Sequence, residues 1–96
     1  MAYHTIIFDP KIINTIVTEI ISMTPGVDKS KEVWIDIDAE NCVINIIYSS
    51  LSETVNVVDI SRKIQSAVYE RLSRLLNIYH NLLKVNIKCV YSSNSN

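Results

Sequence analysis

The sequence predicts an α+β domain in which a mostly antiparallel sheet carries two helices packed on one face. Two long segments repeat apolar residues at helical spacing, and four shorter segments are rich in β-branched and aromatic residues. These segments follow one another in the order β-α-β-β-α-β. Strands joined by a hairpin, with helices gathered on one side of the sheet, are typical of this order.

Length and composition indicate a single domain with its own core, since 48% of the 96 residues are hydrophobic. We assign residues 1–91 to the domain and residues 92–96, SSNSN, to a disordered polar tail. No uncharged apolar run approaches the roughly 20 residues that span a bilayer. The N-terminus also lacks the basic residues of a signal peptide, so we expect a cytoplasmic protein.

The net charge of −1 gives no overall attraction to nucleic acid, but the charges are unevenly divided. Residues 1–56 carry eight acids and three bases, whereas residues 57–96 carry two acids and six bases. This bipolar pattern can favour self-association or the docking of a partner. The alternative interpretation is that these charges only solvate the outer faces of helices and strands.

The first expected elements are a short strand over residues 3–9, YHTIIFD, and a helix that follows it. Asp9 is the expected N-cap of this helix, and Pro10 suits its first turn, where a missing N–H costs nothing. The apolar residues then fall on one side of the helix: Ile12, Ile13, Ile16, Val17, Ile20 and Ile21. Because β-branched residues are mediocre helix formers, packing must stabilise this helix.

Residues 24–27, TPGV, contain the only glycine in the chain. Thr24 precedes a proline, which biases it away from helical angles and ends the first helix. Gly26 can take a positive φ without a steric penalty. Pro25 and Gly26 are therefore expected to form the structural turn that reverses the helix into a strand.

Residues 32–38 and 42–49 predict a β-hairpin. Pairing residue 37 with residue 42 leaves a four-residue loop, in which Asn41 can accept a positive φ. A shift of one residue would place Asp36 and Asp38 among the isoleucines, so we reject it. The preferred register gathers one apolar face: Val33, Ile35, Ile37, Cys42, Ile44, Ile46 and Tyr48.

Residues 57–76 predict the second helix, with Asn56 as its N-cap. Asn77 is expected to take the left-handed conformation that glycine usually fills after a helix. Residues 82–91 predict the last strand, with alternate side chains directed inward. The expected buried side of the helix is aliphatic: Val57, Ile60, Ile64, Ala67, Val68, Leu72, Leu75 and Leu76.

The residues that could support catalysis or metal binding are too scattered to form a centre. His4 and His80 have no metal-ligand spacing to cysteine or to an acid, and Asp36 with Asp38 makes a poor Ca²⁺ site. Both cysteines are expected to be free thiols in strand-like runs. The sheet lacks the paired aromatic residues that stack RNA bases. We predict no enzyme, no metal, no cofactor and no nucleic-acid partner.

The predicted partner-binding surface is the hairpin face that points away from the helices. Trp34, Val43 and Ile47 project from it, and Val90 joins them from the last strand. Monomers rarely leave such a patch bare, and tryptophan is enriched at interfaces. The hypothesis is that this face binds a protein partner or a second copy, with Tyr69 on the outward side of the second helix as a further contact. The alternative is that a loop or the tail covers it.

Three segments together resemble the alkaline shock protein (envelope stress-response) family: TPGV after an Ile-rich helix, VNVVDISRKIQSAVYERLSRLLNI, and KVNIKCV. The resemblance covers residues 6–91, although residues 28–31, DKSK, replace the family's glycine-rich loop. Val58 and Asn77 stand where the family has proline and glycine. The matching positions are Pro25, Gly26, Val27, Val55, Asn56, Val57, Ile64, Gln65, Val68, Val85, Asn86 and Ile87.

What this resemblance implies is a small, non-catalytic cytosolic accessory protein of Gram-positive bacteria or their wall-less relatives. It would act through protein contacts in envelope stress or lipid metabolism, in some cases beside the membrane through an anchored partner. A small-molecule-sensing regulatory domain is the alternative, because βαββαβ folds can bind metabolites between subunits. A ligand that binds the native state raises its stability, so a thermal-shift screen separates the two.

Overall fold

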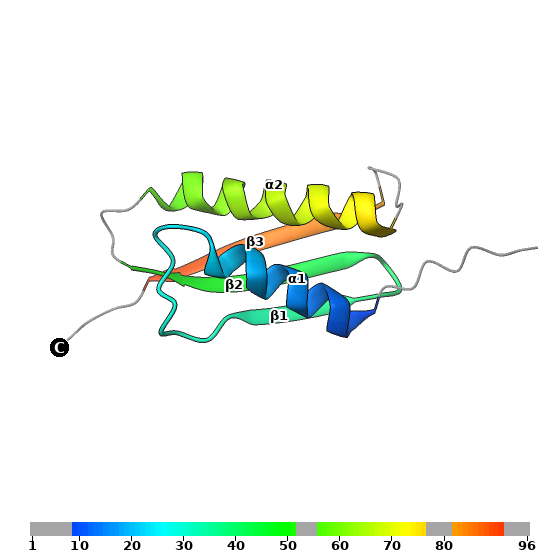
Figure 1. Ribbon diagram of the computed structural model, residues 1–96, viewed down its shortest axis with the longest axis horizontal. Coiled ribbons are helices and arrows are strands. Elements are labelled where there is room, and N and C mark those ends of the chain that lie inside the picture. Colours follow the sequence, from blue (N-terminus) through cyan, green and yellow to red (C-terminus); the bar gives the residue numbers. More distant parts are fainter. Residues whose placement is uncertain (1–8, 52–55, 77–81, 92–96) are drawn as a thin grey trace, which may run out of the picture.

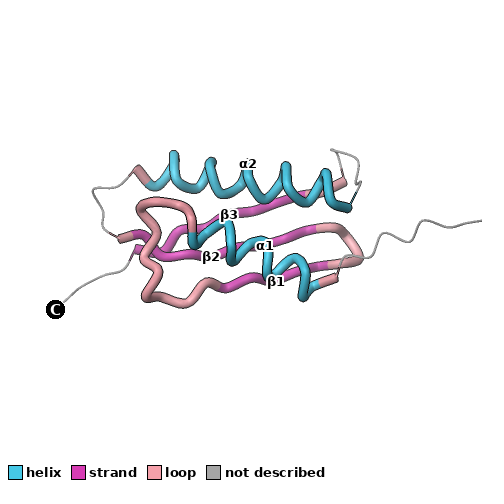
Figure 2. The backbone as a smooth tube through the Cα atoms, viewed as in Figure 1, coloured by secondary structure: helices cyan, strands magenta, loops and turns pink. Residues whose placement is uncertain are grey.

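The computed structural model describes residues 9–51, 56–76 and 82–91. The α+β prediction is confirmed, and both helices lie over the same face of a sheet (Figures 1 and 2). The expected first strand and tail, together with His4, Asn77 and His80, lie outside the described residues. The described elements are α1 (Pro10–Ser22), β1 (Trp34–Asp38), β2 (Val43–Ser50), α2 (Val57–Leu76) and β3 (Lys84–Tyr91).

The described sheet has three strands in the order β1-β2-β3 and is mixed. β1 pairs with β2 antiparallel, as the hairpin prediction requires, whereas β3 pairs with β2 in parallel. The parallel pair arises because α2 carries the chain from the end of β2 back to its start (Figure 1). Such a crossover connection is what parallel neighbours need.

The predicted hairpin register is wrong by two residues, because Ile37 pairs with Ile44 and Asp38 with Val43. A shift of two leaves every side chain on its predicted face. The Asp38 carboxylate stabilises the loop by accepting hydrogen bonds from Asn41 N (3.2 Å) and Asn41 Nδ2 (2.9 Å). The left-handed residue of the loop is Cys42, with φ 56°, and not Asn41 as predicted.

The core lies between the helices and the inward face of the sheet. In β2, every second side chain from Ile44 to Ser50 is buried, which is the alternation of a strand with one covered face. Ile12 and Leu75 were expected inward but are 46% and 56% exposed. The buried apolar residues are Ile13, Ile16, Val17, Ile20, Ile21, Val27, Ile44, Ile46, Tyr48, Ile60, Ile64, Val68, Leu72, Leu83 and Val85.

Both helices begin at their predicted caps. Asp9 Oδ1 accepts a hydrogen bond from Lys11 N at 2.9 Å, and Asn56 Oδ1 accepts one from Asp59 N at 3.0 Å. Arg71 of α2 then forms an ion pair with Glu19 of α1 at 2.9 Å. Because both of these side chains are about half exposed, this ion pair aligns the helices more than it stabilises them.

The TPGV segment ties the end of α1 to the end of β2. Gly26 has φ 93°, which confirms the predicted role of the glycine, and its carbonyl accepts a hydrogen bond from Leu51 N at 2.9 Å. Val27 is buried and forms an antiparallel bridge with Ser50. The turn therefore does more than reverse the chain, because it also adds a short backbone contact to β2.

Candidate interaction surface on the open face of the sheet

The sheet face opposite the helices, which we call the open face, is where the predicted contact residues lie. Side chains alternate across a sheet, so the residues between the buried ones of β2 and their partners in β1 and β3 share this face. Its residues are Trp34, Asp36, Asp38, Val43, Asn45, Ile47, Ser49, Lys84, Asn86, Lys88 and Val90.

The structure brings together four of the five predicted contact residues. Trp34 is 65% exposed and lies directly beside Ile47 in the hairpin register. Val90 is exposed, whereas Val43 and Ile47 are half buried in the central strand. Their role in binding stays a prediction, but their positions form one surface of this chain.

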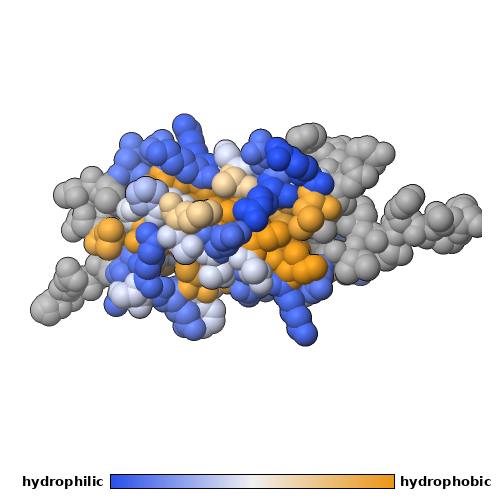
Figure 3. All heavy atoms as spheres, viewed as in Figure 1, coloured by the Kyte–Doolittle hydropathy of each residue, from blue (hydrophilic) through white to orange (hydrophobic). Residues whose placement is uncertain are grey.

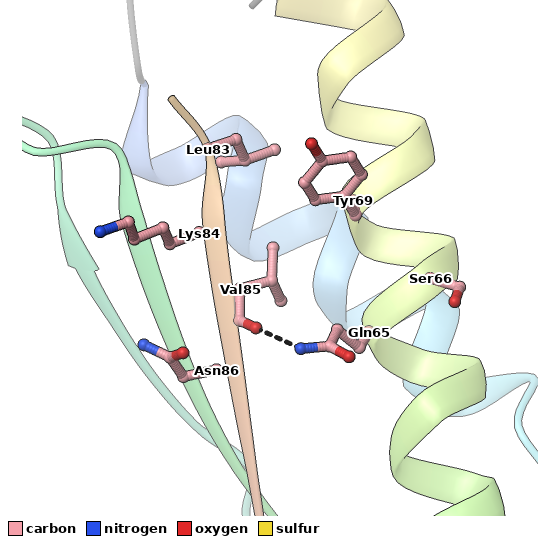
Figure 4. Close-up of a pocket in the computed structure, with 7 residues that line it drawn as sticks. All are labelled: Gln65, Ser66, Tyr69, Leu83, Lys84, Val85 and Asn86. Carbon is pink, nitrogen blue, oxygen red and sulfur yellow. Dashed lines mark hydrogen bonds between the residues drawn. The ribbon is translucent and has the colours of Figure 1, made fainter. Parts of the chain in front are cut away.

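Tyr69, the fifth predicted contact residue, lies elsewhere and does not project outward as predicted. Its side chain is half buried and packs against the core. Figure 4 shows it between α2 and β3, beside Leu83 and above Gln65. The prediction failed because the sequence does not show that this flank of α2 lies alongside β3.

The open face is electrically divided across the strands. Asp36 and Asp38 lie on β1 at one edge, and Lys84 and Lys88 lie on β3 at the other. Two interstrand spacings separate these edges, which is about 10 Å. The bipolar charge seen in the sequence is therefore concentrated into an acidic edge and a basic edge of a single face.

Pairing between the strands aligns these residues in three rows across the sheet. In the middle row, Asn86 Nδ2 donates a hydrogen bond to Asn45 Oδ1 at 2.9 Å, and Asp36 is the next residue in the row. The rows on either side each end on a lysine. They are Trp34, Ile47 and Lys88, and Asp38, Val43 and Lys84.

The local structure changes the protonation equilibrium of the Asp38 carboxylate. Hydrogen bonds from the side chain and then the backbone of Asn41 favour the ionised form and lower the pKa of Asp38 below its ordinary value of 3.8. The carboxylate is fully solvated. The acidic edge of the open face therefore keeps its charge at neutral pH.

The described residues contain no group of three histidine, cysteine, aspartate or glutamate side chains that could hold a metal ion. The two cysteines are free and half buried. Cys42 lies beside the first residue of β3, Lys84, whereas Cys89 lies near the end of the same strand and pairs with Tyr48. The strand length separates the two thiols, so they do not form a pair.

A second apolar patch lies on the helix side of the molecule. Figure 3 shows apolar side chains between the two helices. Of the large apolar residues with substantial exposure, Ile12 lies in the first turn of α1 and Leu75 in the last turn of α2. No helix of the described part is both long enough and apolar enough to cross a membrane.

These features define an αββαβ domain with two helices over a mixed sheet. No family model matches the chain, and no curated protein matches it. Solved structures of MamM CTD share the fold. A histidine-to-alanine variant of MamM CTD has a TM-score of 0.60 at 11% identity, covering 88% of this chain and 100% of that chain. A cysteine-to-serine variant has a TM-score of 0.58 at 13% identity, covering 86% and 96%.

A third neighbour, described as the copper form of MamM CTD, has a TM-score of 0.57 at 11% identity and covers 91% of this chain and 90% of that chain. At such low identity the likeness concerns the fold. Each of these neighbours is a MamM C-terminal domain. They overturn the predicted membership of the alkaline shock protein family, and with it the expected role in envelope stress or lipid metabolism.

The resemblance misled because its motifs describe turns and caps. Pro25 and Gly26 form a reversal after a helix, and Asn56 caps the start of the next helix. Val85 and Asn86 belong to the β3 segment that pairs with β2. Any chain that places a helix, a hairpin and a crossover helix in this order needs the same local signals, so these signals do not identify a family.

Proposed function

We propose that this chain is a non-enzymatic interaction domain that self-associates through the open face of its sheet. The observation that carries the proposal is the combination of an exposed Trp34 with opposite charges on the two edges of the same face. An exposed aromatic residue with aliphatic neighbours supports an interface. Because an acidic edge and a basic edge lie on the same face, this face is electrostatically complementary to a second copy of itself. This complementarity supports a second copy as the partner.

Charge selects one arrangement of the two copies. A twofold axis parallel to the strands places β1 of one copy over β3 of the other, so that acids face lysines. An axis across the strands would instead place β1 over β1 and bring the two acidic edges together, which is unfavourable. In the first arrangement, Asp38 faces Lys84 of the second copy, and Asp36 faces Asn86.

The same arrangement gives Trp34 a specific contact. Trp34 and Lys88 end the same row on opposite strands, so the twofold axis brings the indole of one copy over the ammonium group of the other. A cation over an indole face is stabilised by about 0.5–2 kcal/mol. Ile47 lies between them in the row and supplies apolar area at the centre of the interface.

The size of the face limits the affinity. Three strands of at most eight residues offer a patch of about 14 by 26 Å, which is smaller than a standard protein interface. We therefore expect a reversible dimer whose population depends on concentration.

The experiment is a charge exchange followed by sedimentation velocity across a range of concentrations. Asp38→Lys and Lys84→Glu, made singly, are each expected to weaken the dimer, since each places like charges together in the strand-parallel arrangement. The double variant Asp38→Lys with Lys84→Glu is expected to recover much of the association. Association that is unchanged in all three variants would reject the open face as the interface.

A further inference from the structure

A groove runs between α2 and the outer edge of β3, away from the open face, and we call it the edge groove. One half has a volume of about 490 Å³ and is lined by residues such as Tyr69 and Val85 (Figure 4). The other half, of about 410 Å³, is lined by Val58 and Arg62 of α2 and by the part of β3 that follows. Gln65 lines both halves, and its side chain spans the groove where they meet.

The floor of the edge groove is an unpaired strand edge. Lys84 N donates to Cys42 O at 3.0 Å, so the even-numbered residues of β3 direct their backbone groups toward β2. Val85, Ile87 and Cys89 consequently direct their N–H and C=O groups toward the groove. Within residues 9–51, 56–76 and 82–91, no strand pairs with this edge.

The side chain of Gln65 already occupies one hydrogen-bonding position along this strand edge. Its Nε2 donates to Val85 O at 2.7 Å, across the groove from α2 (Figure 4). A side-chain amide has the chemistry of a peptide group, so Gln65 takes the place that a backbone N–H of an added strand would take. The next two residues with outward-facing backbone groups are Ile87 and Cys89. Together they present two N–H and two C=O groups to the groove.

The wall of α2 beside those two residues combines an apolar and a basic side chain. Val58 is 63% exposed although it is a large apolar residue. Arg62 lines the same half of the groove, and no acid lines either described half. Lys88 also borders this half, but its side chain lies on the open face. Asp59, the nearest acid on α2, pairs with Lys63 at 3.4 Å.

We propose that the edge groove binds an extended, acidic peptide segment of a partner protein, which adds to the sheet as a strand beside β3. Backbone hydrogen bonds to Ile87 and Cys89 provide the register. A carboxylate of the peptide pairs with Arg62, and an apolar residue of the peptide covers Val58. This proposal does not depend on self-association through the open face, because Val58, Arg62 and the outward backbone groups of Ile87 and Cys89 take no part in that interface.

The charges also argue against a second copy in the edge groove. Two β3 strands placed edge to edge around a twofold axis would bring their lysine side chains together on one face, which is unfavourable. Placing β1 of one copy against β3 of the next would leave an unsatisfied edge at each end and build an open chain of molecules. A separate acidic segment can pair with the backbone groups of the β3 edge without bringing lysines together and without building an open chain of molecules.

The test uses a peptide with fluorescein on its N-terminus, Val-Thr-Glu-Thr-Val-Thr-Glu-amide, whose valines and glutamates share one face of an extended strand; it is titrated with the full chain by fluorescence anisotropy. Two control peptides replace both glutamates by lysine or carry N-methyl groups on the two valines. N-methylation keeps the side chains but removes backbone donors, so strand addition requires that it reduce binding. We expect only the unmodified acidic peptide to bind, and hydrogen exchange at the Ile87 and Cys89 amides to slow at least tenfold when it does.

Two variants locate the site. Arg62→Glu is expected to raise the dissociation constant of the peptide about tenfold or more, since a charge-assisted hydrogen bond is lost. Lys63→Glu is the matched control, because Lys63 lies one position along the same helix and outside the edge groove. This variant should change the peptide affinity little. Equal binding of the N-methylated peptide, equal binding to Arg62→Glu, or no binding at millimolar protein would each overturn the proposal. Trp34→Ala must leave peptide binding intact, and Arg62→Glu must leave self-association intact.

Discussion

Replacing Trp34 by alanine is the sharpest perturbation of the proposed interface, because it removes the largest exposed apolar side chain of the open face. The indole is 65% exposed, so the substitution creates no cavity in the core. A tryptophan side chain can bury up to about 250 Å², which leaves about 160 Å² accessible here. The free energy of folding should therefore change by less than about 1 kcal/mol, as is usual for surface substitutions.

The expected loss of association follows from the same area. If half of the accessible indole area is covered in the dimer, about 80 Å² per copy leaves water, which stabilises the dimer by about 2 kcal/mol per copy at about 25 cal/mol per Å². Two copies give about 4 kcal/mol, or a dissociation constant raised about a thousandfold. Trp34→Lys should weaken the dimer further, because the new charge faces Lys88 of the second copy.

Sedimentation velocity from micromolar to near-millimolar protein measures this change, and urea unfolding confirms that the variant is folded. Val58→Ala is the matched control, because Val58 is 63% exposed but lies on α2, away from the open face. The reasoning is refuted if Trp34→Ala and the parent chain sediment alike at every concentration. It is refuted equally if Val58→Ala dissociates the dimer as strongly as Trp34→Ala.

Three predictions concern folding. Gly26→Ala forces a Cβ into φ 93° and should lower the free energy of unfolding by about 1–2 kcal/mol, measured by urea denaturation; an unchanged value would contradict the turn geometry. Ile64→Ala empties a fully buried position and should cost about 2–5 kcal/mol in the same assay, and a loss below 1 kcal/mol would argue against the α2 packing. Asp38 has a lowered pKa, so its contribution to stability is present above the ordinary pKa of 3.8 and is lost as the pH falls below it. Asp38→Asn should remove that part of the pH dependence, and an identical acid titration of the two proteins would count against the loop contacts.

The fold could be predicted because its determinants are local. Single residues with special backbone preferences predict the helix caps, Asp9 and Asn56, and the turn at Gly26. Alternating apolar residues in the hairpin also placed each side chain on the correct face. The register itself was two residues off, because period-two alternation cannot distinguish shifts of two, and the contacts from Asp38 to Asn41 decided between them.

The sequence by itself determined the α+β class, the boundaries of the helices and the gathering of Trp34, Val43, Ile47 and Val90 on one face. Periodicity and capping act between near neighbours, so they are readable along the chain. The tertiary structure alone decided that β3 runs parallel to β2, that Tyr69 faces β3, and that the edge groove lies along α2. These features depend on where a crossover returns the chain and on which flank of a helix meets a strand, and both are set by packing between residues far apart in sequence.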